Sequence, residues 1–276
     1  MPVDTLAILL RIAAAASTVE VWAAANQQFA AMGFGHVNYG YTRFRSDKSL
    51  GDPDDALFLT TADADYAQRY FRNGFYARTP AYRWAQTHDG ACTWTWVREA
   101  MLAGQLSDEE AQTVRQNVAA GITAGITISF PASSSRSKGA MGLIADAGLD
   151  HVAVDRIFAE QGKDLLAVAH MMHLKIIQFP MTGRKCSLTA RQREALEWVA
   201  DGKTSQDIAL LIGVSPAMVE KHLRLAREAL DVGTTAQAVA KASLMNLIFH
   251  VQPAPTSLGM AARGFISIRF SPANPA

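Results

Sequence analysis

Apolar residues in the first part of the chain follow two different periods. Over residues 5–32 they recur at helical spacing, and Gly33 and Gly35 follow where a helix would end. Residues 36–44 are aromatic and alternate with polar positions, which predicts a strand. Residues 56–60 predict its neighbour, reached through a turn rich in Gly, Pro and Asp. The chain is therefore predicted to begin with one long helix and two paired strands.

The middle of the chain also combines helices with strands. Ser107-Asp-Glu-Glu110 is a capping box, with a hydroxyl at the N-cap and a carboxylate three residues later, and it opens a helix. Residues 125–130 and 140–144 predict a hairpin, and an apolar helix is predicted over residues 151–177. Strands bracketed by helices favour a mixed sheet covered on both faces, an α-β-α sandwich over residues 1–177. Short helical stretches are predicted at residues 66–74 and 81–87.

The pattern of apolar and polar residues changes after residue 177. Residues 178–187 contain Pro180 and Gly183, which break the pattern, and we place a linker between two domains there. Residues 188–250 predict about four helices and no strand. Residues 251–276 hold four prolines and are predicted to be poorly ordered, although residues 265–270 alternate as a strand does. The fold class predicted is an α+β domain followed by an all-α four-helix domain.

The amino-acid composition excludes several classes of protein. The charge is +1, from 26 basic and 25 acidic residues, so a nucleic-acid partner must recognise a local patch. Hydrophobic residues make up 49%, which excludes an intrinsically disordered chain. Cys92 and Cys186 alone cannot form a disulfide framework or a zinc cage, and His170 and His173, which lack further metal ligands, are interpreted as surface or interface residues. No apolar run reaches the ~18 residues of a membrane span. Asp4 stands where an export signal would have a positive charge, so we expect a cytoplasmic protein.

The C-terminal segment carries a series of helix-start signals. Thr189-Ala-Arg-Gln192 is a capping box, Thr204 opens the next helix, and Gly213 marks a tight turn. Ser215-Pro216 then places a hydroxyl at an N-cap and a proline at the first helical position. Two short helices joined by a glycine turn form a helix-turn-helix, whose second helix is shaped to enter the major groove. The residues predicted to face inward are Ala195, Leu196, Val199, Ile208, Ala209, Leu211, Ile212, Val219, Leu223, Ala226 and Leu230.

The second helix of this pair is predicted to expose a charged side. Lys221, Arg224 and Arg227 recur at helical spacing and offer donors to phosphates and base edges, with Glu220 beside them. Any amphipathic helix exposes some lysines and arginines, so the spacing alone is also consistent with a solvated face. The four-helix context and the Ser-Pro start favour DNA binding.

The stretch from Leu188 to Ala240 resembles, without a gap, the LuxR-type helix-turn-helix. The similarity includes Leu188-Thr-Ala-Arg-Gln-Arg-Glu-Ala-Leu196 and Val214-Ser-Pro-Ala-Met-Val-Glu-Lys-His222. Gln192 stands where the family usually has glutamate, and Glu220 where relatives often carry a basic or polar residue. A glutamate there repels phosphate but can accept from a cytosine amine, which implies an unusual operator preference. The candidate DNA-binding residues are Thr204, Ser215, Glu220, Lys221, Arg224 and Arg227.

The first domain resembles the autoinducer-binding domain of quorum-sensing LuxR proteins, from about residue 36 to 175. The similarity is carried by Tyr66-Ala-Gln-Arg-Tyr-Phe-Arg-Asn-Gly-Phe-Tyr-Ala-Arg-Thr-Pro80, Thr93-Trp94 and Ala120-Gly-Ile-Thr-Ala-Gly-Ile-Thr-Ile128. The resemblance implies that Tyr66 and Tyr70 bind the polar head of an acyl-homoserine lactone, with Trp94 as a wall. The candidate ligand-binding residues are Tyr66, Tyr70, Thr79, Trp94 and Thr127, and the candidate pocket-shaping residues are Phe71, Tyr82, Gly125, Ile126 and Leu143.

Physical chemistry supports the same positions. Tyr66 and Tyr70 are four residues apart, so both hydroxyls can point to one place from one face of a helix. A buried polar head needs such partners, because each unmet hydrogen bond costs ~1–3 kcal/mol. Tyrosine and tryptophan at this spacing are also common in protein cores and interfaces. Thr79 departs from the family, whose aspartate accepts from the ligand amide, and this departure bears on the identity of the ligand more than on the presence of one.

These observations predict a cytoplasmic homodimer that binds a near-palindromic double-stranded DNA operator under the control of an acyl-homoserine lactone or an analogue. No cofactor or metal is predicted. The apolar helix over residues 151–177 is a candidate dimer surface or core helix. One alternative is an orphan regulator with a non-lactone ligand or none, which Thr79 favours. A remote alternative is an acyl-lactone-processing enzyme, for which the sequence offers no nucleophile–base pair or metal cluster.

Overall fold

The computed structural model describes residues 4–45, 53–181, 187–250 and 266–267. The chain divides into two compact units, one of residues 1–176 with 257–276 and one of residues 177–256. Most of the predicted linker and nearly all of the predicted tail, apart from residues 266–267, lie outside the described residues. Among the described helices none is both long and apolar enough to cross a membrane.

The first unit is built on a sheet of strands in the order β3-β4-β5-β1-β2-β6. Every neighbouring pair is antiparallel, so the prediction of a mixed sheet is wrong. The predicted hairpin is confirmed by β4 and β5, and the predicted pairing of the first two strands by β1 and β2. The strands are β1 (His36–Thr42), β2 (Leu57–Thr60), β3 (Gly90–Thr93), β4 (Gly125–Phe130), β5 (Lys138–Ile144) and β6 (Ile266–Ser267).

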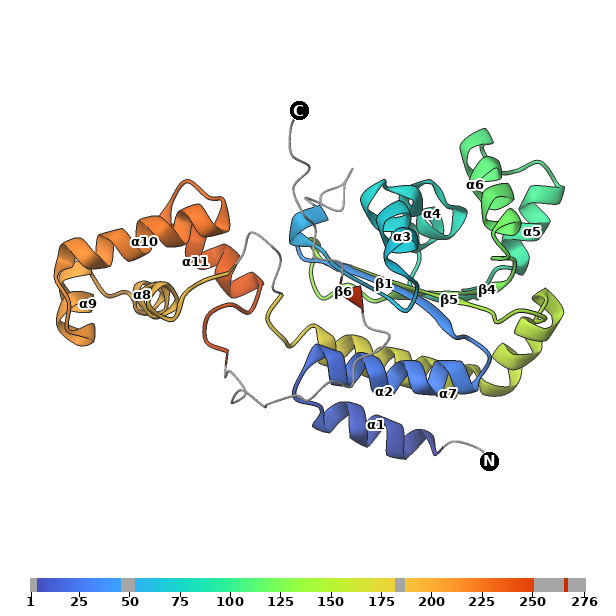
Figure 1. The fold of residues 1–276 in the computed structure, drawn as a ribbon, viewed down its shortest axis with the longest axis horizontal. Coiled ribbons are helices and arrows are strands. Elements are labelled where there is room, and N and C mark those ends of the chain that lie inside the picture. Colours follow the sequence, from blue (N-terminus) through green and yellow to red (C-terminus); the bar gives the residue numbers. More distant parts are fainter. Residues whose placement is uncertain (1–3, 46–52, 182–186, 251–265, 268–276) are drawn as a thin grey trace. The chain divides into compact units, whose positions relative to one another are not determined.

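One face of the sheet is covered by α2 (Thr18–Ala31) and α7 (His151–Ile176), and α1 (Thr5–Ala14) packs on the outer side of these two helices (Figure 1). The prediction of a single helix over residues 5–32 is wrong, because the chain breaks between α1 and α2. Ser17 caps α2 by accepting from the backbone N–H of Glu20, whose carboxylate accepts in turn from the N–H of Ala16. These bonds satisfy backbone donors at a helix start, which stabilises the break.

Helix α7 is a core helix of its own unit. Leu165, Val168 and Met172 are fully buried, and the helix packs on α1, α2 and β4. A helix that is covered on this scale by its own chain cannot offer those side chains to a second copy. The structure therefore favours core over dimer surface for these three residues of α7.

The opposite face of the sheet is covered by short elements: η1 (Pro53–Asp55), α3 (Ala64–Ala67), the π-helical turn η2 (Gln68–Arg72), the 3-10 turn η3 (Phe75–Arg78), α4 (Pro80–Thr87), α5 (Thr95–Leu102) and α6 (Asp108–Ala119). In Figure 1, α3 to α6 lie above the sheet and α2 and α7 below it, which is the predicted α-β-α sandwich. The capping box of Ser107 and Glu110 is confirmed at the start of α6. Strand β3 and helix α5 were not predicted, because both are short and half-buried and lack a clear period.

The second unit contains α8 (Ala190–Ala200), α9 (Ser205–Ile212), α10 (Pro216–Leu230) and α11 (Thr235–Leu244). Capping boxes open α8, α9 and α11, and Ser215 caps α10 with Pro216 at its first turn. Gly213 ends α9 in the left-handed conformation that glycine tolerates. The predicted burial of Val219, Leu223, Ala226 and Leu230 along α10 is confirmed. The inward prediction is wrong for Leu211, which is 52% exposed.

A polar pair is buried between the sheet and α7. The Tyr39 hydroxyl lies 2.9 Å from Nδ1 of His173, and the imidazole ring stacks on Phe130 at a centroid distance of 4.1 Å. His173 is only 5% exposed, so its interpretation as a surface or interface residue is wrong. Burial, together with the neighbouring His170, lowers the pKa of His173 to about 4.

We expect this histidine to make the first unit acid-sensitive. Because the pKa falls from about 6.5 in the unfolded chain to about 4 in the folded one, the unfolded chain binds the proton more tightly. Stability that is present above pH ~6.5 is therefore lost as the pH falls toward 4, by up to about 3 kcal/mol. Thermal unfolding of the full chain measured between pH 7.5 and 4.5 checks this.

The substitution His173→Gln removes the titrating group and is expected to flatten that pH dependence. The matched control is His36→Gln, at an exposed histidine of the same unit, which is expected to keep the wild-type pH profile. Equal pH profiles for wild type and His173→Gln would show that another group controls acid sensitivity.

Candidate ligand cavity and candidate DNA-binding surface

A cavity of about 410 Å³ lies in the first unit, between the sheet and the layer of α3 to α6. Its walls come from β1, β5, the segment from α3 to α4, both α5 and α6, and the start of α7. A volume of this size is within the range of small-molecule sites, and most of its lining is apolar. The predicted residues that line it are Tyr66, Tyr70, Thr79 and Trp94.

A chain of hydrogen bonds fixes Tyr66 at the wall of this cavity. Thr60 Oγ1 donates to Asn38 Oδ1 at 2.7 Å, and Asn38 Nδ2 donates to the Tyr66 hydroxyl at 2.8 Å. Burial raises the pKa of Tyr66 to about 12, so the phenol remains a proton donor. Its own O–H is therefore available to a ligand acceptor. Asn38 was not among the predicted site residues.

Tyr70 lies beside Tyr66, and the two rings stack with centroids 5.2 Å apart. The pair belongs to α3 and the π-helical turn η2, not to one regular helix. Burial, with the neighbouring Tyr66 and Tyr76, raises the pKa of Tyr70 well above its ordinary value. Both rings thus stay neutral and form one wall of the cavity.

Trp94 is held flat against the sheet by two contacts. Its Nε1 donates to Thr127 Oγ1 at 2.8 Å, and its backbone N–H donates to the carbonyl of Gly125 at 2.8 Å. A Cβ on Gly125 would lie 3.0 Å from the indole ring and 2.4 Å from the Leu143 carbonyl. Gly125 therefore lets the indole approach the strand closely. Thr127 supports Trp94 and does not line the larger cavity.

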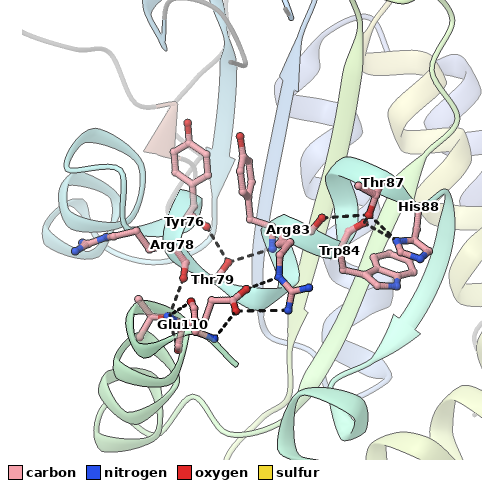
Figure 2. A network of polar contacts seen from close by, with 11 residues as sticks. Tyr76, Arg78, Thr79, Arg83, Trp84, Thr87, His88 and Glu110 are labelled. Carbon is pink, nitrogen blue, oxygen red and sulfur yellow. Dashed lines mark hydrogen bonds and ion pairs between the residues drawn. The ribbon is translucent and has the colours of Figure 1, made fainter. Parts of the chain in front are cut away.

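Thr79 lines the cavity and also caps α4. Its hydroxyl donates to the Tyr76 carbonyl at 2.8 Å and accepts from the Tyr82 backbone N–H at 3.2 Å (Figure 2). The one proton of this hydroxyl is thus used within the protein, and Thr79 offers a ligand only a neutral acceptor.

An ion pair next to Thr79 joins α4 to α6. Arg83 Nε donates to Glu110 Oε1 at 2.5 Å, and Thr113 Oγ1 reaches the Arg78 carbonyl at 3.1 Å (Figure 2). Burial raises the pKa of Glu110, but the bonds from Arg83 and from Ser107 outweigh it and leave the pKa below its usual value. The contacts hold the two helices that enclose the cavity together.

A second cavity of about 100 Å³ shares Tyr70, Thr79 and Trp94 with the first. Aromatic side chains wall it, including the predicted Phe71 and Tyr82, and Thr127 also lines it. The remaining aromatic side chains are those of Phe58 and Tyr76. Tyr39 and Tyr41 also border this cavity, but their rings contact His173 on the opposite face of the sheet. A narrow space of this kind suits a flat or slender apolar group.

Two predicted pocket residues lie elsewhere. Ile126 and Leu143 are fully buried on the sheet face that packs on α7, so their assignment to the ligand slot is wrong. Side chains alternate along a strand, and Thr127, which contacts Trp94, places Ile126 on the opposite face. In β5, Gly142 and Ile144 line the cavity instead. The same alternation in the sequence could have excluded Ile126 once Thr127 was chosen.

The walls from α5 and α6 were also missed by the sequence reasoning. No local motif marks these residues, since they converge only because two short helices cross the same end of the sheet. They comprise Val97, Arg98, Met101, Leu102, Val114, Arg115, Asn117, Val118 and Ala119, and the adjoining wall adds Ile122, Thr123 and His151.

The helix-turn-helix of the second unit exposes α10, the predicted recognition helix. Glu220, Lys221 and Arg224 are exposed on it, as predicted. Ser205, at the first turn of α9, donates to the Glu220 carboxylate, and Arg224 Nη1 pairs with Glu228 at 2.5 Å. The predicted recognition helix therefore presents charges of both signs, of which Arg224 and Glu228 form an ion pair.

The other predicted DNA-binding residues have structural partners as well. Arg227 is half-buried and donates to Thr235 Oγ1 at 2.9 Å, which ties α10 to α11. Thr204 and Ser215 cap α9 and α10. Exposed helix N-termini suit phosphate oxygens, so these two caps remain candidates for backbone positioning on DNA.

The family model for the autoinducer binding domain matches residues 17–176, more than half of the chain. The chain belongs to this family of LuxR-type regulators. A second model, for region 4 of sigma-70, matches residues 186–230 of this LuxR-type chain, which include α8, α9 and α10.

Curated relatives are similar to this LuxR-type chain over different lengths. The transcriptional activator protein AnoR of Acinetobacter nosocomialis is 41% identical over 61 residues, covering 22% of this chain and 26% of AnoR. The quorum sensing-dependent regulator RpaR of Rhodopseudomonas palustris is 32% identical over 90 residues, covering 33% and 37%. The transcriptional activator protein SolR of Ralstonia nicotianae is 26% identical over 225 residues, covering 79% and 87%. The chain thus matches about a quarter of AnoR and about a third of RpaR.

The solved structure of SdiA in complex with octanoyl-rac-glycerol has a similar fold. The TM-score is 0.50 at 18% identity, over 90% of this chain and 96% of SdiA. The similarity supports the two-part architecture of the LuxR-type chain.

We expect Gly125→Ala to destabilise the first unit by about 1–3 kcal/mol, the usual cost of forcing an extra carbon into a packed site. The reason is the close approach of the Trp94 ring and the Leu143 carbonyl. Gly142→Ala is the matched control, because its Cβ would meet nothing within 4 Å although Gly142 lines the cavity. Urea denaturation of both variants measures the difference, and equal losses would contradict the packing role of Gly125.

Proposed function

We propose that this protein is a transcription regulator whose binding to double-stranded DNA is controlled by a small molecule held in the cavity of the first unit. The observation that carries the proposal is the cavity of about 410 Å³ walled by Tyr66, Tyr70 and Trp94, in a chain that also contains a helix-turn-helix. Membership in a family of LuxR-type regulators favours this function over a lactone-processing enzyme.

The ligand acts by stabilising the folded first unit. A ligand that binds only the folded state adds RT ln(1 + [L]/Kd), or about 2.7 kcal/mol at one hundred times the Kd. This is a large share of the stability of an ordinary domain. The folded, occupied protein forms a homodimer in the cytoplasm, and its two recognition helices bind a near-palindromic operator.

The test begins with the purified full chain and DNA selected from a random library for binding to it. Extracts of signal-producing bacterial cultures are added, and the melting temperature and the affinity for the selected DNA are measured. A ligand-dependent change in both supports the proposal. A chain that responds to no extract, or that selects no DNA, contradicts it.

The natural candidate for the ligand is an acyl-homoserine lactone or an analogue, in keeping with the family. Thr79 favours a variant of this ligand class, because the family aspartate that accepts from the ligand amide is replaced by a neutral hydroxyl already bonded to Tyr76. A non-lactone ligand is therefore the second candidate, and no cofactor is proposed.

We expect Thr79→Asp to raise the affinity for N-octanoyl-homoserine lactone about tenfold, because a carboxylate accepts the amide N–H more strongly than a hydroxyl does. Aspartate is also a favourable N-cap, so α4 is kept. Thr79→Asn is the control, since asparagine caps equally well but is neutral. Isothermal titration calorimetry compares the three proteins; a gain shared by both variants would exclude charge as the cause.

We expect Arg224→Ala to weaken operator binding about tenfold and to reduce the salt dependence of the affinity, because it removes one cation from the recognition helix. Ligand retention should be unchanged. Arg191→Ala is the matched control, since Arg191 forms a similar exposed pair with Glu194 on α8. Electrophoretic mobility shift at several salt concentrations measures both variants, and an equal effect of the control would argue against a specific role for Arg224.

A further inference from the structure

The larger cavity has a charge pattern that the proposed lactone does not use. Arg98 of α5, Arg115 of α6 and His151 of α7 line it. Among the described residues that line either cavity there is no aspartate or glutamate. The polar groups of the cavity wall are therefore neutral or positive.

Both arginines are exposed side chains without a partner of their own. Within the described part of the chain, no hydrogen bond or ion pair is formed by the guanidinium of Arg98 or of Arg115. Arg83, Arg191 and Arg224, in contrast, each pair with a glutamate. Two unpaired guanidinium groups at one cavity are thus free to bind an anion.

His151 adds a third polar group to the same wall. Its Nδ1 is buried and has no hydrogen-bond partner within the described residues. Burial and the charge of Arg98 lower the pKa of His151, whereas Asp155 and Asp150 act in the opposite direction. Neither of these carboxylates lines the cavity, and Asp155 accepts from Thr95 at 2.8 Å.

At position 79 the cavity wall has no negative charge that would repel an anionic ligand. The hydroxyl of Thr79 is neutral, and the tyrosines beside it, Tyr66 and Tyr70, are protonated donors. The rest of the wall is apolar and includes Val97, Met101, Val114, Val118 and Ile122. The cavity as a whole therefore matches a molecule with an apolar body and a negative charge.

We propose that the ligand is an anionic amphiphile, with an apolar chain enclosed between α5, α6 and the sheet and a carboxylate bound by Arg98 and Arg115. This inference rests on the proposed function and names the ligand class of the same cavity. Guanidinium groups suit this role because their planar donors bind both oxygens of a carboxylate.

The test compares two probes that differ in charge at one end. N-Octanoyl-homoserine lactone is neutral, and N-octanoyl-homoserine, its ring-opened form, has the same acyl chain and amide and a free carboxylate. Isothermal titration calorimetry is carried out on the full chain at neutral pH. The wild type is expected to bind the ring-opened form at least tenfold more tightly than the lactone. Raising the salt concentration is expected to weaken the binding of the ring-opened form only.

The variants Arg98→Gln, Arg115→Gln and the double variant are expected to lose this preference, because each loses far more affinity for the ring-opened form than for the lactone. Both side chains are exposed, so folding is expected to be retained, which the melting temperature checks. Arg11→Gln, at an exposed arginine on α1, is the matched control and should behave as the wild type.

Tighter or equal binding of the lactone by the wild type overturns the inference but leaves the proposed function standing. A preference for the carboxylate that survives in the double variant also overturns it, because the charge is then recognised elsewhere. Binding of neither probe overturns the anionic inference too. The proposed function is tested separately: it fails if no culture extract changes the melting temperature or DNA binding, or if the chain selects no DNA.

Discussion

The structure depends on one geometric constraint, the alternation of side chains along an antiparallel sheet that is covered on both faces. In β1, Asn38 faces the cavity while Tyr39 bonds to His173 of α7. In β4, Thr127 contacts Trp94 while Phe130 stacks on His173. One face can therefore be a tightly packed core while the other remains partly hollow.

The hollow face is kept in order by hydrogen bonds. Side-chain hydrogen bonds connect Thr60, Asn38 and Tyr66 in series. A separate hydrogen bond joins Trp94 to Thr127. Buried polar groups are costly unless they are paired, so each bond fixes a side chain at the wall instead of letting it fill the space. The side chains that line such a cavity lack van der Waals contacts on one side, and a bound molecule supplies those contacts.

The outer wall of the cavity has a different character. Helices α5 and α6 are short, and α6 is joined to α4 by Arg83 and Glu110. Leu102 and Val118, which line the cavity, are still 80% and 52% exposed, so this wall buries little apolar area of its own. A ligand that lies against these side chains removes more apolar surface from water than the unoccupied protein can, and its binding is correspondingly favoured.

Short-range hydrogen bonding and periodicity are enough to predict the helix caps at Ser107, Thr189 and Ser215, the β4–β5 hairpin and the buried stripe of α10 from the amino-acid sequence. The motif residues Tyr66, Tyr70, Thr79 and Trp94 could likewise be named without coordinates. Which face of each strand borders the cavity depends on the fold, since a shift of one residue along a strand reverses every side chain. For this reason the prediction placed Ile126 and Leu143 on the wrong face. The fold also brings Asn38, Arg98, Arg115 and His151 to one cavity, which the sequence could not indicate because their separations along the chain carry no signal of proximity.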